Sequence, residues 1–185
     1  IGYAGPWEMT DLIDPLADDP DNVLISAWKL GSNPLTAVDL LDVNTGRRKR
    51  VATAPVNRAT FLTDARGQVR FARGAQNDNA SKLYYRDDNQ SEWRLVNDEA
   101  STGQVDIPVG FSADGRIAYF NATLDDGPDA LVAWKPATNE RKQVLRDAKA
   151  GDQQKNLQRL QTMVLELETR AAAESLTLKG ADTLM

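Results

Sequence analysis

Between residues 22 and 146, apolar residues occur in short runs, and each run is followed by turn-forming residues such as Asn, Asp and Gly. Runs this short, without a helical period of apolar positions, predict strands. The pattern therefore indicates an all-β fold made of antiparallel hairpins. The predicted strands cover residues 23–28, 36–43, 47–54, 60–62, 69–72, 82–86, 93–96, 109–112, 117–121, 130–135 and 141–145.

Two segments of the chain resemble each other, which suggests a repeated unit. Residues 61–71 and 111–120 each begin with an aromatic residue, pass through Ser or Thr to a turn with Asp and Gly, and end on an aromatic residue. Four strands that recur every 40 to 50 residues or so are typical of a β-propeller blade. We therefore predict a partial β-propeller of about two to three four-stranded blades over residues 23–149. Second hairpins follow at 83–95 and 131–145, and residues 36–52 resemble the second hairpin of an earlier unit.

The segment before the first predicted blade, residues 1–22, is acidic and contains three prolines. Proline disfavours a long helix. We expect this lead-in to be mostly loop, with an entry strand or a short helical turn around residues 10–13.

The character of the chain changes after Gly151. Residues 152–175 lack Pro and Gly and are rich in good helix formers, so a helical tail is predicted over residues 150–185. Its apolar seam is either a short coiled coil or the face of one amphipathic helix that packs on the propeller or on a partner chain. A seam of this kind would cover exposed sheet surface or support self-association. It consists of Leu157, Leu160, Val164, Leu167 and Ala171.

Charge and composition exclude several classes of function. The 185 residues carry a net charge of -5, which argues against a nucleic-acid partner, and no apolar run is long enough to span a membrane. The basic run 47–50 follows the turn residues 44–46, so we interpret it as a solvated hairpin arm, with anion binding as the alternative. We expect no disulfides, because the chain has no cysteine.

The chemistry needed for most hydrolases is also missing. The chain has no histidine and no Gly-x-Ser-x-Gly nucleophile elbow, so it cannot form a Ser-His-Asp triad or a His-ligated metal site. The adjacent carboxylates at 18–19, 87–88 and 125–126 lie next to turn residues and are interpreted as solvated turns, with calcium binding or paired acid and base chemistry as the alternatives. The sequence therefore predicts no catalytic, cofactor-binding or metal-binding residues and no cofactor.

Aromatic residues are the remaining candidates for a ligand surface. Trp28, Trp93 and Trp134 lie in predicted strands, where packing between blades is expected, whereas Trp7 lies outside them. Tyr84 and Tyr85 are consecutive, so one should face inward and the other outward.

A series of phrases, in this order and spacing, resembles the propeller of bacterial S9-type serine peptidases, the prolyl oligopeptidase and acylaminoacyl-peptidase group. The resemblance covers residues 13–147 and implies a non-catalytic propeller that filters or gates short peptides for a separate α/β-hydrolase domain. The predicted helix after Gly151 departs from the pattern of that group. The phrases are DPDNVLI (19–25), VDLLDVNTG (38–46), FLTD (61–64), GQVR (67–70), LYYR (83–86) and FSADGR (111–116).

The resemblance implies two partners, the α/β-hydrolase domain of a parent peptidase and, transiently, its peptide substrate. The alternative is a freestanding interaction module that assembles through its C-terminal helix. The sequence leaves open whether the chain is a fragment, a fusion or a complete protein, and whether it works in the periplasm or the cytoplasm of a bacterium.

Overall fold

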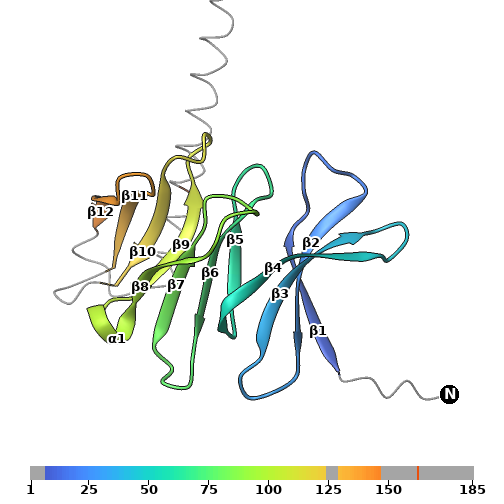
Figure 1. Cartoon of the computed structure of the whole chain (residues 1–185). Coiled ribbons are helices and arrows are strands. Elements are labelled where there is room, and N and C mark those ends of the chain that lie inside the picture. The colour runs from blue at the N-terminus through green and yellow to red at the C-terminus, as the bar shows by residue number, and fades with distance from the viewer. Residues whose placement is uncertain (1–6, 124–128, 147–161, 163–185) are drawn as a thin grey trace, which may run out of the picture. The chain divides into compact units, whose positions relative to one another are not determined.

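The computed structural model describes residues 7–123, 129–146 and 162, and strands dominate it (Figure 1). Apart from Thr162, the predicted tail helix lies outside the described residues, and so does its whole apolar seam. The chain divides after Val105 into two compact units, Ile1–Val105 and Asp106–Met185. The described strands form three four-stranded antiparallel sheets, two in the first unit and one in the second.

Strands follow one another in each sheet in chain order, so every sheet is a simple meander. The first sheet consists of β1 (Glu8–Asp14), β2 (Asn22–Lys29), β3 (Leu35–Asp42) and β4 (Arg48–Asn57). The second consists of β5 (Thr60–Thr63), β6 (Val69–Ala75), β7 (Ser81–Tyr85) and β8 (Arg94–Asp98). The third consists of β9 (Asp106–Phe111), β10 (Ala118–Ala122), β11 (Ala130–Lys135) and β12 (Glu140–Arg146).

The sheets confirm the all-β prediction and extend it at one end. Strand β1 lies inside the acidic stretch assigned to the lead-in, and it pairs with β2 from Glu8↔Lys29 to Asp14↔Leu24. The first sheet therefore has four strands, where the repeat pattern showed only part of a unit. Our interpretation of the lead-in as mostly loop is corrected over residues 8–14, which form the entry strand.

Glycine shapes the hairpin turns that the sequence predicted. Gly46, Gly67 and Gly115 all have φ close to +70°, a left-handed conformation that costs glycine little. Asp carboxylates complete several turns by accepting a hydrogen bond from the backbone N–H two residues later, as Asp64 does from Arg66 and Asp114 from Arg116. These bonds explain why Asp precedes Gly in both repeated phrases.

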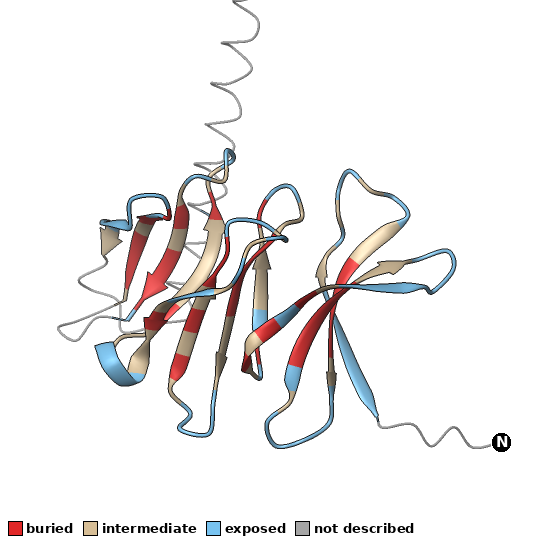
Figure 2. Cartoon of the chain, viewed as in Figure 1, coloured by how far each residue is buried: buried red, intermediate tan, exposed pale blue. Residues whose placement is uncertain are grey.

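A hydrophobic core joins the first two sheets. Leu24, Val38 and Ala52 of the first sheet pack with Val69 of β6, and all four are buried (Figure 2). A second cluster contains Ala54, Val56, Ala59 and Ala72. Since burial of each Val or Leu stabilises the fold by about 1.5–3 kcal/mol, these contacts hold the two sheets face to face.

The third sheet has a core of its own. Phe120 and Trp134 are buried with ring centroids 5.6 Å apart, and the Trp134 indole N–H donates to Asn139 Oδ1 at 2.8 Å. Ala122, Ala130 and Val132 form a small buried cluster in the same sheet. Trp134 is thus a core residue of the third sheet.

Candidate functional site

A cavity of about 460 Å³ lies between the first sheet and the start of the second, within the first unit. Its walls come from three stretches of chain, residues 11–13, 26–36 and 58–61. We call it the inter-sheet cavity. Its volume falls within the range of small-ligand sites, about 300–1,000 Å³. The lining residues are Asp11, Leu12, Ile13, Ser26, Trp28, Pro34, Thr36, Arg58, Ala59, Thr60 and Phe61.

The first wall follows from strand periodicity. Asp11 lies opposite Ser26, and Ser26 opposite Val38, so these three side chains share one face of the first sheet. That face also carries Leu24, two residues before Ser26, and the cluster that packs against Val69 of the second sheet. The same alternation that builds the core therefore turns Asp11, Ser26 and Trp28 toward the cavity.

The second wall is the connection between β4 and β5. Arg58 has φ of +52°, and its backbone N–H donates to Pro34 O at 2.8 Å. Its Nη2 donates to Gln76 O and Asn79 Oδ1, both at 2.8 Å, so the guanidinium is held by the turn between β6 and β7. These contacts fix the connection at both its backbone and its side chain.

Gly74 of β6 lets this connection approach closely. A Cβ at position 74 would overlap the backbone oxygen of Asn57 and would lie 3.2 Å from Ala59 Cα. Any side chain there would push the β4–β5 connection outward and reshape the cavity wall.

Some polar groups in the cavity already form hydrogen bonds with other described residues, and others do not. Ser26 Oγ donates to the Asp11 carbonyl at 3.4 Å, and Thr60 Oγ1 donates to Arg73 O at 3.3 Å. The Asp11 carboxylate is exposed and makes no hydrogen bond or ion pair within the described part of the chain. Asp11 is thus available to a ligand, while both hydroxyl groups are hydrogen-bonded to backbone carbonyls in the described residues.

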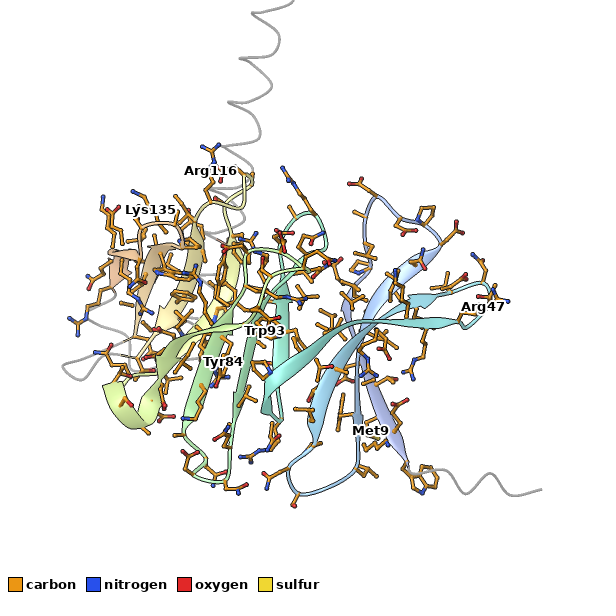
Figure 3. All side chains as sticks on the ribbon, in the orientation of Figure 1. Met9, Arg47, Tyr84, Trp93, Arg116 and Lys135 are labelled. Carbon is orange, nitrogen blue, oxygen red and sulfur yellow. The ribbon has the colours of Figure 1, made fainter. Side chains whose placement is uncertain are left out.

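Exposed apolar side chains continue from the cavity. Met9 lies opposite Trp28, and the Leu30 N–H donates to Trp7 O at 3.1 Å. Large exposed apolar side chains gathered at one place are typical of contact surfaces. We call this set the apolar rim; its members and exposed fractions are Trp7 (81%), Met9 (44%) and Leu30 (63%). Figure 3 shows Met9 at the end of the first sheet where β1 begins.

The four tryptophans have different roles. Trp93 lies between the first two sheets, where its indole N–H donates to Thr53 O of β4 at 3.0 Å and its ring packs on both core clusters. The expected packing between sheets is therefore confirmed for Trp93. Trp28 lines the inter-sheet cavity, and Trp7 is exposed.

The tyrosine pair divides as expected from strand geometry. Tyr85 is fully buried, and burial raises the pKa of its hydroxyl, which accepts a hydrogen bond from Arg70 Nη2. Arg70 also binds Asp64 at 2.7 Å, so the three residues form a buried network within the second sheet. Tyr84 is only half-buried and packs on the second core cluster (Figure 3).

The basic run is the tip of a hairpin arm. Its four residues are exposed, and Figure 3 shows Arg47 at the end of the arm. Arg50 Nε lies 2.5 Å from the buried Asp39, and Arg48 Nη1 lies 2.5 Å from Glu8. Half of the run is thus already paired with carboxylates of its own sheet.

The paired carboxylates serve turns. Asp19 accepts a hydrogen bond from the Asp21 N–H, and Asp88 accepts from Gln90 and Ser91. Asp125 and Asp126 lie outside the described residues. In residues 7–123 and 129–146, no three potential metal ligands come together.

No described helix is long and apolar enough to cross a membrane. The one helix with described bounds, α1 (Glu99–Thr102), is a single turn capped by Asp98 and Gly103.

Comparison with known proteins gives a fold and no family. No protein-family model matches the chain. No curated protein matches it either. Among solved structures, TolB from Acinetobacter baumannii is similar, with a TM-score of 0.51 and 12% sequence identity. The match covers 77% of this chain and 33% of that TolB chain, so the chain spans about a third of its length. At this identity the likeness concerns fold alone, and the chain has a β-propeller-like fold built from four-stranded antiparallel blades.

Proposed function

We propose that the chain is a non-catalytic β-propeller segment that recognises polypeptide in the inter-sheet cavity. The observation that carries the proposal is the lining of that cavity. It combines an available carboxylate, a fixed guanidinium and two aromatic side chains, and the hydroxyl groups of Ser26 and Thr60 are bonded to backbone carbonyls. A lining of this kind binds and orients a ligand without transforming it.

The recognised polypeptide would be handed to a separate catalytic domain. The sequence phrases that resemble S9-type peptidases support this role, since in that group the propeller filters peptides for an α/β-hydrolase domain. Reading the complete gene tests this parentage. A Gly-x-Ser-x-Gly elbow downstream, followed by Asp and His, supports it.

A freestanding interaction module is the second candidate. The apolar rim favours it, because exposed tryptophan and leucine side chains suit contact with another protein. A stop codon directly after Met185 in the natural gene, with no hydrolase domain encoded, would support the module over the peptidase segment.

Peptide binding itself is tested by filling the cavity. Thr60 lines the cavity and is exposed, whereas Thr10 is exposed on the opposite face of β1 from Asp11. We expect T60W to weaken binding of fluorescein-labelled, end-blocked hexapeptides by roughly tenfold or more in fluorescence anisotropy. T10W should bind like the parent. If the parent chain binds none of the hexapeptides, or if T60W binds them as well as T10W does, the proposed function is wrong.

A further inference from the structure

The inter-sheet cavity has one negatively charged and one positively charged residue in its lining. Among its lining residues Asp11 is the one carboxylate and Arg58 the one cation, and they belong to different walls. Arg58 Nη2 donates both of its hydrogens to neutral acceptors, Gln76 O and Asn79 Oδ1. The Asp11 carboxylate faces the cavity and has no ion-pair partner in the described residues. A ligand with a positive charge could therefore form an ion pair with the Asp11 carboxylate.

The apolar part of the lining suits a long cationic side chain. Trp28 and Phe61 lie in the walls, with Ile13 and Pro34 beside them. Aromatic faces attract ammonium and guanidinium groups, and the methylene stems of Lys and Arg bury well against apolar surface. A small inorganic cation would leave this surface uncovered.

Arg58 provides a second contact of opposite polarity. Its Nη1 and Nε hydrogens are not used in the bonds to Gln76 and Asn79, and a guanidinium donates well to carbonyl oxygen. A peptide carbonyl beside the inserted side chain would meet this donor. The cavity thus matches a basic residue in a polypeptide better than a free amine.

We infer that the inter-sheet cavity takes one Lys or Arg side chain of a partner polypeptide, with apolar neighbours that contact the rim. Asp11 binds the cation, Trp28 and Phe61 pack on the stem, and Arg58 donates to the adjacent backbone. The inference rests on the proposed function, since it names the residue type by which the polypeptide is recognised.

The test uses three peptide amides that differ at one position, Gly-Leu-Arg-Leu-Gly and its Arg→Gln and Arg→Glu versions, each blocked at its N-terminal amine by the fluorescein label. We expect the parent chain to bind the Arg peptide roughly tenfold more tightly than the Gln peptide, and the Glu peptide most weakly. A Lys peptide should follow the Arg peptide, since the two cations share the site. The preference should shrink as salt is raised, because Asp11 is exposed.

Two matched variants test whether the preference for the Arg peptide depends on Asp11. D11N should bring the Arg and Gln peptides to within about twofold of each other, whereas D18N, an exposed carboxylate outside the cavity, should keep the parent's preference. Equal binding of Arg and Gln peptides by the parent, or a preference that survives D11N, overturns the inference and leaves polypeptide recognition standing. Absence of binding by every peptide overturns the proposed function as well.

Discussion

Gly67, in the turn between β5 and β6, is under two constraints at once. Its φ is +69°, and a Cβ there would overlap Leu16 Cδ2 from the loop between β1 and β2. Gly46 has nearly the same φ, +70°, with nothing within 4 Å of its virtual Cβ. Substitution of Gly46 should therefore introduce backbone strain alone, whereas substitution of Gly67 should introduce both backbone strain and steric overlap.

We expect G46A to destabilise the protein by about 1 kcal/mol and G67A by about 2–4 kcal/mol, since only G67A adds overpacking to the left-handed strain. Urea unfolding, followed by intrinsic tryptophan fluorescence, measures both. The double variant L16A/G67A should be less destabilised than the sum of its single variants, because removal of the leucine relieves the overlap. Equal losses for G46A and G67A would contradict this account.

Asp98 gives the protein a pH-dependent contact. Lys82 Nζ lies 2.6 Å from Asp98 Oδ2, and this hydrogen bond lowers the pKa of Asp98 and raises the pKa of Lys82. A lowered folded-state pKa means that Asp98 contributes its full stability above its ordinary pKa of about 4 and loses it as the pH falls through the folded value. Lys82 behaves in the opposite way and loses its contribution only at strongly alkaline pH.

We therefore expect D98N to lower the melting temperature at pH 7 and to have a smaller effect at pH 3. Asn is a good helix N-cap, so the variant should keep the hydrogen bond from the Ala100 N–H and remove mainly the charge. D18N serves as the control at both pH values. A difference between D98N and the parent that does not change with pH would refute the ion-pair explanation.

At the scale of elements, Trp93 connects the second sheet to the first. It precedes β8, yet its indole N–H bonds to Thr53 O of β4, and the Arg86 guanidinium lies 4.5 Å from its ring centroid. The side chain contributes to both core clusters of the first unit. Loss of this residue should therefore weaken the pairing of whole sheets.

We expect W93F to cost about 1 kcal/mol, for the lost hydrogen bond, and W93A about 2–4 kcal/mol, for the lost packing as well. Thermal unfolding followed by circular dichroism measures both. W7F, at a residue that is 81% exposed, is the matched control and should unfold like the parent. If W93A unfolds like W7F, Trp93 does not hold the sheets together.

Hairpins could be predicted from the sequence because their turns carry a local signal, such as Asn44-Thr45-Gly46 or Asp114-Gly115. Strand β1 gave a weaker signal because it is an edge strand, exposed along most of its length and without a regular alternation of apolar residues. Helix α1 is four residues long, and its residues are polar or small, so the sequence shows no helical spacing of apolar residues that would predict it. The inter-sheet cavity had no local signal at all, since Asp11, Trp28 and Arg58 meet only after two sheets have packed.

For the whole molecule, the absence of histidine and of a Gly-x-Ser-x-Gly elbow predicts that the chain does not cleave peptides by a serine-triad mechanism. We expect the purified chain to release no para-nitroaniline from peptide substrates, because no group in it can act as the imidazole base of a serine triad. The measurement is an absorbance assay after protease contaminants have been removed. Saturable turnover that co-purifies with the chain would require a different mechanism.

The residues that line the inter-sheet cavity lie within residues 11–61, and the contacts that hold Arg58 in place extend to Asn79. A duplication or deletion of whole four-stranded repeats after β8, which ends at Asp98, would leave this lining and its supporting contacts in place. The proposed recognition site is therefore encoded independently of the repeats that follow it.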